Sequence, residues 1–189
     1  MVPLTSLAVP MVISAVLVFL ASFIIHMVLG YHKGDVRKLP DAQEDEILSV
    51  VSRLNLAPAD YGVPHPGSPE RMKEPAFIAK MTKGPVILMN VSPGTAPSMA
   101  KSLIMWFVYT LVVAFFAGYI TSRAVAPGTS YLSVFRFIGT SAFMGFALGQ
   151  IPDSIWYRRP WSRTFVSIVD SLIYALLTAG VFGWLWPGR

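Results

Sequence analysis

The stretch "LAVPMVISAVLVFLASFIIHMVLGYHKGD", residues 7–35, decides the fold of this chain. Its first part, residues 7–29, contains no Lys, Arg, Asp or Glu, and His26 is the one side chain there that can carry a charge. A run of about 20 apolar residues is long enough to cross a bilayer as a helix. Charged residues begin at Lys33, directly after Gly30 and Tyr31. The stretch therefore predicts a membrane-spanning helix that leaves the bilayer at "GYHKGD".

A cleaved signal peptide is the alternative interpretation of this run. Such a peptide has a positively charged first segment and an apolar core of about 7–15 residues. The segment before the run, "MVPLTS", has no Lys or Arg, and the positive charges follow the run instead of preceding it. We therefore expect the first helix, residues 1–30, to be retained.

Composition and three further apolar runs extend this prediction to the whole chain. Of the 189 residues, 54% are hydrophobic and 13% are charged, whereas soluble domains have about 25% charged residues. The further runs cover about residues 102–120, 131–151 and 165–186, within a region 102–189. Arg136 interrupts the second of them and Asp170 the third. We expect an all-α integral membrane protein with four transmembrane helices.

Residues 31–101 form the one sizeable segment outside the expected helices. A segment of about 70 residues is marginal for a hydrophobic core of its own. "LPDAQEDEILSVVSRL" and "GSPERMKEPAFIAKM" predict short amphipathic helices, and "PVILMNV" is compatible with a strand. We expect this segment to pack on the membrane surface, on helix ends or on a partner.

The distribution of Lys and Arg predicts the orientation. Two loops on the same side of a four-span chain carry most of the flanking positive charges: Lys33, Arg37, Lys38, Arg158, Arg159 and Arg163. The opposite side carries Arg123 and Arg189. Loops rich in Lys and Arg remain in the cytoplasm. We expect a protein of the cytoplasmic (inner) membrane, with residues 31–101 and 152–163 cytoplasmic and both termini external.

Small residues recur every four positions on the last two expected helices. Stripes of this kind let helix backbones approach closely in a membrane. They predict a tight hairpin of these helices, although either stripe could instead face a second copy or another subunit. The residues are Ser141, Gly145 and Gly149 on one helix and Ser171, Ala175, Ala179 and Gly183 on the other.

Four polar side chains are expected at similar depth near the cytoplasmic ends of three helices: His26, Gln150, Asp153 and Asp170. Ionisable groups inside a bilayer are costly and mark candidate functional sites. In the functional interpretation, the Asp170 carboxylate accepts a proton or cation together with His26. In the structural interpretation, Asp170 pairs with an Arg of the loop "YRRPWSR" or hydrogen-bonds across the bundle.

The histidines are weak candidates for a metal site. His26 and His32 are six residues apart, which on a continuous helix places them about 240° apart around the axis. A shared metal would therefore require the helix to break at Gly30. The remaining histidine, His65, has no neighbouring ligand at a metal-binding spacing, so His32 and His65 are expected to be surface residues and no metal or other cofactor is predicted.

Several function classes are excluded by motif. The chain has no cysteine, no GxxxxGK[ST], no HExxH and no GxSxG, and the basic residues flank helices instead of forming a nucleic-acid surface. The sequence therefore favours a non-enzymatic accessory or scaffold subunit of a larger membrane complex, whose partners are the bilayer and other subunits or further copies. The alternative is a small proton- or ion-coupled transporter or channel, acting as an oligomer through Asp170 and His26.

Overall fold

The computed structural model describes residues 1–96 and 98–188. The chain divides into two compact units. The first, here called the bundle unit, comprises Met1–Val36 and Ser98–Arg189, and the second, the loop unit, comprises Arg37–Pro97. Arg189, one of the charges used above to predict the orientation, lies outside the described residues.

The bundle unit is built from long apolar helices. The helix α1 (Ala8–Phe23) follows a 3-10 turn and continues into a five-residue π-helix, η2 (Ile24–Val28). The other helices are α4 (Met99–Ala124), α5 (Tyr131–Ala147), α6 (Ile151–Trp156) and α7 (Trp161–Trp184). Within the described ranges, four continuous helical stretches are long and apolar enough to cross a membrane: Leu4–Val28, Met99–Ala124, Tyr131–Trp156 and Trp161–Trp184. The prediction of four such helices is confirmed.

The ends of the third and fourth stretches differ from the sequence prediction. A 3-10 turn at Leu148–Gln150 joins α5 to α6, so the third stretch runs on to Trp156. Most of residues 152–163, expected as a loop, is therefore helical. Both prolines of this segment are compatible with helix starts: Pro152 is in the first turn of α6, and Pro160 directly precedes α7. As a result, Asp170 lies more than two turns inside α7, deeper than the sequence implied.

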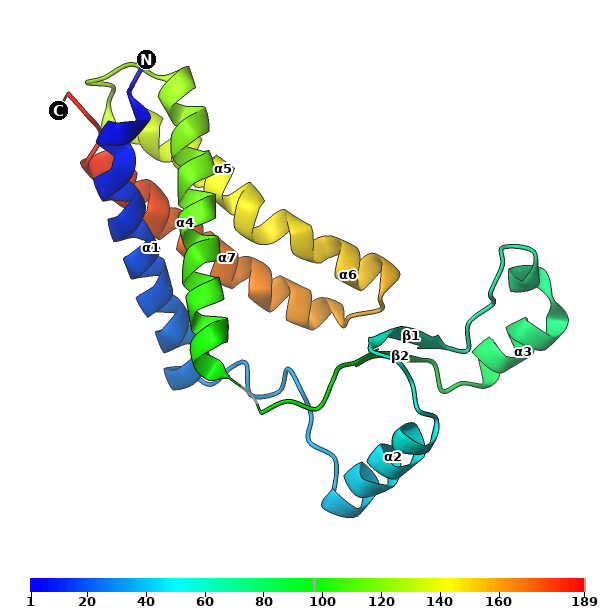
Figure 1. Ribbon diagram of the computed structural model, residues 1–189. Helices are drawn as coiled ribbons and strands as arrows, with labels where there is room; N and C mark the ends of the chain where they lie inside the picture. The colour runs from blue at the N-terminus through cyan, green and yellow to red at the C-terminus, as the bar shows by residue number, and fades with distance from the viewer. Residues whose placement is uncertain (97, 189) are drawn as a thin grey trace. The chain divides into compact units, whose positions relative to one another are not determined.

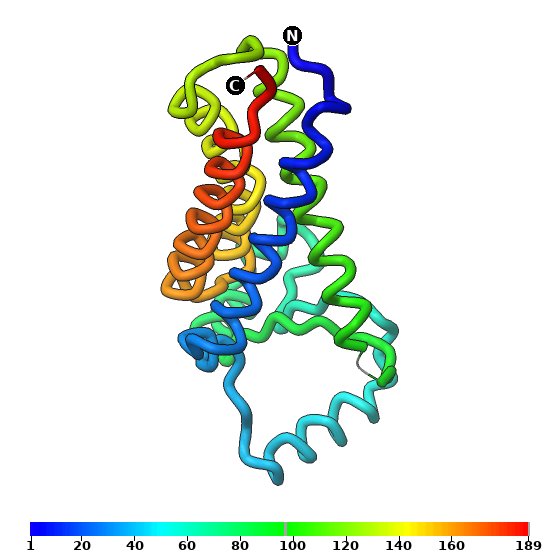
Figure 2. The backbone as a smooth tube through the Cα atoms, turned by 90° about the vertical axis from the view of Figure 1, so that its left-hand side faces the viewer, coloured from blue at the N-terminus to red at the C-terminus, as the bar shows by residue number. Residues whose placement is uncertain are grey.

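The helices of the bundle unit form an up-down-up-down arrangement (Figures 1 and 2). Each packs beside two others, in the order α1, α4, α5, α7 and back to α1. Backbone hydrogen bonds close the end that holds the N-terminus: Val2 N donates to Ser122 O at 3.3 Å, and Gly128 N donates to Pro187 O at 2.8 Å. In Figure 1 the α5–α7 pair leans away from the α1–α4 pair toward the opposite end, where α1 ends and α7 begins. We call this the open end of the bundle.

The loop unit contains two helices and a small sheet. Its elements are α2 (Asp41–Arg53), β1 (Ala59–Val63), a 3-10 turn, α3 (Pro75–Lys83) and β2 (Ile87–Val91). The strands pair in antiparallel fashion, with Ala59 opposite Val91 and Val63 opposite Ile87. The segment compatible with a strand is thus a strand, and the term "all-α" describes the bundle unit but not the whole chain. Neither α2 nor α3 has a buried residue.

Candidate functional site

The site begins where α1 ends. In the π-turn η2, Leu29 N donates to Ile24 O at 3.0 Å, and single π-turns of this kind often occur at functional sites. Gly30 follows with φ +69°, a conformation that L side chains rarely adopt and that glycine adopts without strain. The chain therefore turns back on itself here. This turn brings Tyr31 and His32 against α7.

Asp170 is the centre of the site. It is 3% exposed, and both of its carboxylate oxygens have partners. His32 Nε2 lies 2.8 Å from Asp170 Oδ2, and the Tyr31 hydroxyl donates to Asp170 Oδ1. A buried carboxylate is costly unless its oxygens are hydrogen-bonded. The two residues that follow Gly30 therefore compensate for the burial of a charge in the middle of an apolar helix.

These partners are not the arginines considered from the sequence but side chains that hydrogen-bond to Asp170 across the bundle, the other possibility of the structural interpretation. Arg163 Nε lies 3.5 Å from Asp35 Oδ1, and Arg159 Nη1 lies 3.6 Å from Asp153 Oδ2. His32, expected at the surface, is instead enclosed, with its side chain 9% exposed. The turn at Gly30 is the reason, because it carries the ring inward from the helix end.

The two histidines come together through the same turn. Their rings are stacked, with centroids 4.3 Å apart and planes 6° from parallel. His26 Nδ1 lies 3.0 Å from the carbonyl oxygen of Ser22, one turn earlier. One ligand atom each from His26, His32 and Asp170 lies within 4.8 Å of the others. The break at Gly30 that a shared site requires is thus present.

Asp35 completes the polar network on the far side of His32. Its Oδ2 lies 2.9 Å from His32 Nδ1. This hydrogen bond, helped by the nearby Arg163 guanidinium, holds the pKa of the Asp35 carboxyl below its ordinary value. Partial burial, together with the hydrogen bond to Asp170 and its charge, raises the pKa of the Tyr31 phenol to about 12. The Tyr31 phenol therefore stays protonated and remains a donor.

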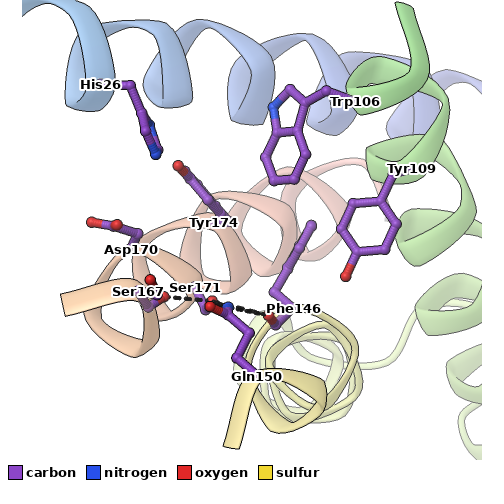
Figure 3. A pocket seen from close by; sticks show the side chains of 9 residues that line it. All are labelled: His26, Trp106, Tyr109, Phe146, Gln150, Ser167, Asp170, Ser171 and Tyr174. Carbon is purple, nitrogen blue, oxygen red and sulfur yellow. Dashed lines mark hydrogen bonds between the residues drawn. The ribbon is translucent and has the colours of Figure 1, made fainter. Parts of the chain in front are cut away.

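A cavity of about 320 Å³ opens beside Asp170 at the open end of the bundle. Aromatic rings form part of its wall, and polar groups of α7, of η2 and of the 3-10 turn at Leu148–Gln150 form the rest (Figure 3). The lining residues are His26, Trp106, Tyr109, Phe146, Gln150, Ser167, Asp170, Ser171 and Tyr174. The Tyr174 hydroxyl is buried, and no hydrogen-bond partner is found for it among the described residues. In Figure 3 this hydroxyl lies on the same side of the cavity as His26 and Asp170.

Three of the four polar residues singled out in the sequence line this cavity. His26 and Asp170 are two of them, and Gln150 is the third, with its amide nitrogen donating to Phe146 O at 2.9 Å and Ser171 Oγ at 3.2 Å. Asp153 does not line the cavity and pairs with Arg159 instead. Tyr31 and Tyr174 were missed as site residues, and His32 was named only as a weak candidate for a metal ligand. The His32-x-x-Asp35 spacing is the one signal in the sequence that could have pointed to the turn.

The small-residue stripe of α7 faces α5. Ser171 Oγ donates to Phe146 O at 3.1 Å, and a Cβ at Gly139 would lie 3.3 Å from Ala179 Cβ. Ala175 is 1% exposed. A Cβ at Gly183 would lie 2.8 Å from the Tyr131 ring.

The stripe of α5 is divided between different neighbours. A Cβ at Gly145 would lie 3.1 Å from Val113 of α4, whereas a Cβ at Gly149 would meet no described atom within 4 Å. Ser141 is half-buried. Among the described glycines of α5, the one in close contact with α7 is therefore Gly139, which lies outside the predicted stripe.

The remaining predicted residues lie apart from the cavity lining. Lys33 belongs to the bundle unit, and its side chain folds over Gly30. Arg37, Lys38 and His65 belong to the loop unit, where Lys38 pairs with Asp41 at 2.7 Å and His65 Nδ1 accepts from Gly67 N at 3.0 Å. Arg158 has φ +55° in the turn between α6 and α7.

Comparison of the chain with protein-family models, with curated proteins and with solved structures gives no match. The chemical groups of the site itself indicate what it can bind. It presents a buried carboxylate and two imidazoles beside an open cavity with aromatic walls. Carboxylates and imidazoles bind cations, and aromatic faces favour them as well.

Proposed function

We propose that this chain is an integral protein of the cytoplasmic membrane that binds a small cation in the cavity beside Asp170. The four long apolar helices support its insertion in a bilayer. The Lys and Arg residues that flank the open end support an orientation with residues 31–101 in the cytoplasm and both termini outside. In this orientation the cavity lies near the cytoplasmic face.

The buried position of Asp170 is the observation that carries the proposal. An ionisable group inside a spanning helix is costly, and such groups mark ion and substrate paths. Asp170 is buried among apolar helices, and it lines a cavity together with His26. A purely structural carboxylate needs only the hydrogen bonds to Tyr31 and His32, whereas Asp170 also reaches the cavity. Ion handling is therefore favoured over the purely structural interpretation.

An accessory subunit of a larger membrane complex is the second candidate. Only 28% to 39% of the most apolar window of each span is buried inside the protein. The greater part of each helix surface is thus left for lipid or for other membrane subunits. Purification from native membranes in a gentle detergent tests this candidate: a stable larger complex supports it, and a lone chain or a homo-oligomer contradicts it.

Thermal unfolding of the purified full-length protein in detergent tests cation binding. We would add Na⁺, K⁺, Mg²⁺, Ca²⁺, Zn²⁺ or tetramethylammonium in turn. A cation that binds only the folded state at 100 times its Kd adds about 2.7 kcal/mol of stability. This corresponds to a rise of several degrees in Tm for a chain of this size. At least one cation of the panel should produce such a rise.

Two matched aspartate variants locate the binding. Asp170→Asn should abolish the rise in Tm, because it removes the charge from the cavity wall. Asp153→Asn should keep it, because Asp153 pairs with Arg159 and does not line the cavity. Binding that persists in Asp170→Asn, or a wild type that responds to none of these cations, would contradict the proposed function.

A further inference from the structure

The bound cation can be assigned to a chemical class. We infer that His26, His32 and Asp170 form a binding site for a divalent transition-metal ion of the Zn²⁺ type. The inference rests on the proposed function, in that it names the cation that the cavity binds. It goes beyond the sequence, which predicted no metal site.

The donor set supports this class. Two imidazole nitrogens and one carboxylate oxygen, with a further position open, are a common zinc arrangement. The three ligand atoms already lie within 4.8 Å of one another, and they come from two segments that are far apart in the sequence. Mg²⁺ and Ca²⁺ prefer sites made of oxygen ligands alone. A set with two imidazoles therefore favours a transition metal over these two ions.

The outer hydrogen bonds of both histidines are those of metal ligands. His26 Nδ1 lies 3.0 Å from the Ser22 carbonyl oxygen, and His32 Nδ1 lies 2.9 Å from the Asp35 carboxylate. In protein metal sites the histidine nitrogen that faces away from the ion usually donates to a carbonyl or a carboxylate. In both rings this leaves Nε2 for the ion. The other oxygen of Asp35 forms an ion pair with Arg163 Nε at 3.5 Å. This ion pair helps to fix the position of the Asp35 carboxylate.

Binding of the ion needs a small rearrangement. His32 Nε2 and Asp170 Oδ2 are now 2.8 Å apart with a proton between them. The ion takes the place of this proton, which passes to solvent, because the histidine nitrogen that binds the ion must carry no proton. The parallel rings cannot both aim Nε2 at one ion, so one ring must tilt. His26 is the exposed member of the three and lies in the π-turn, so its ring is the one with room to tilt.

The orphan hydroxyl of Tyr174 suits the open position. Tyr174 is 3% exposed, lines the cavity and has no hydrogen-bond partner among the described residues. A buried hydroxyl without a partner costs free energy. A water molecule on the metal ion would supply this partner. The cavity thus provides room for a fourth ligand and a polar group to orient it.

Zn²⁺ binding to the full-length protein tests the inference. The protein should be purified without a polyhistidine tag, stripped with a chelator and titrated with Zn²⁺ in a calorimeter. We expect one Zn²⁺ per chain. Co²⁺ in place of Zn²⁺ should give the visible spectrum of a nitrogen and oxygen site, without thiolate bands, because the chain has no cysteine.

Single substitutions identify the ligands. His26→Gln, His32→Gln and Asp170→Asn should each weaken Zn²⁺ binding by more than about 100-fold, and Asp35→Asn by about 10–100-fold, the usual effect of an outer-shell change. The matched control is His65→Gln, which removes the histidine of the loop unit and should leave affinity unchanged. His26→Gln is the decisive variant, because His26 is exposed and its loss does not uncover the Asp170 carboxylate.

The outcomes separate the inference from the proposed function. Zn²⁺ affinity that survives His26→Gln in a folded protein, or that is lost in His65→Gln, overturns the metal site. A wild type that ignores Zn²⁺ but gains stability from another cation in an Asp170-dependent manner overturns the metal site and keeps the cation cavity. A wild type that responds to no cation overturns both.

Discussion

At the scale of single residues, some buried polar groups of the bundle unit pair with a side chain from another helix or helix end, while others donate to a carbonyl one turn earlier in their own helix. Tyr31 and His32, which lie in the same turn, form hydrogen bonds with the Asp170 carboxylate, and Trp106 Nε1 donates to Ser22 Oγ at 2.9 Å. Where lipid surrounds such a bond, no water would be available to replace a lost partner, so the bond would fix the position of a helix as well as that of a side chain.

The buried hydroxyl pair Ser154–Thr164 allows the contribution of one buried hydrogen bond to the stability of the bundle unit to be measured. Their oxygens lie 2.6 Å apart and join α6 to α7 across the short turn. Ser154→Ala should destabilise the protein by about 1–3 kcal/mol, because it leaves the Thr164 hydroxyl buried without this partner. The double variant Ser154→Ala/Thr164→Val should cost less than the sum of the two single changes. Thermal unfolding in detergent gives the coupling energy, and strict additivity would contradict a stabilising bond.

At the scale of elements, hydropathy predicted the centres of the helices but not their ends. Length and apolar composition are local properties, so the four stretches could be read directly from the sequence. The extension to Trp156 and the start at Trp161 could not, because prolines that usually stop a helix also fit its first turn.

The candidate site, too, could be predicted from the sequence only in part. Depth along a helix could be estimated, and it placed His26, Gln150, Asp153 and Asp170 together, of which all but Asp153 line the cavity. The return of Tyr31 and His32 depends on a contact with α7, about 140 residues later in the chain. No local pattern encodes such a contact. The long-range partner, and not the helix content, was the unpredictable part of this molecule.

Three leucine substitutions test which helix contacts are close. A Cβ at Gly145 would lie 3.1 Å from Val113 on α4, and Ala179 Cβ lies 3.3 Å from the Cβ position of Gly139 on α5. Gly145→Leu and Ala179→Leu should each destabilise the fold by about 1–3 kcal/mol, the usual cost of overpacking. Gly149→Leu is the control and should be mild, since a Cβ there meets no described atom within 4 Å. Equal Tm values for all three variants would contradict these contacts.

At the scale of the whole molecule, the two ends of the bundle unit differ in chemistry. The end with the N-terminus is closed by backbone hydrogen bonds and by Trp186, whose ring nitrogen donates to Ala126 O at 3.0 Å. The open end holds the cavity, the ionisable groups and most of the flanking positive charges. A cation site near one face would exchange with that side of the membrane more readily than with the other. The orientation of the chain would therefore decide from which compartment a cation that binds there is taken.

Cysteine labelling in intact cells tests this orientation without background, because the chain has no cysteine of its own. Ser52 lies on α2 of the loop unit and Ala126 in the loop between α4 and α5, and both are exposed. By the positive-inside rule, the Ala126→Cys variant should react with a membrane-impermeant maleimide in intact cells and the Ser52→Cys variant should not. Both should react after the membranes are broken, which shows that each thiol is accessible. The reverse pattern in intact cells would place the loop unit and the cavity on the outer side, and the cation of the Asp170 site would then be drawn from outside the cell.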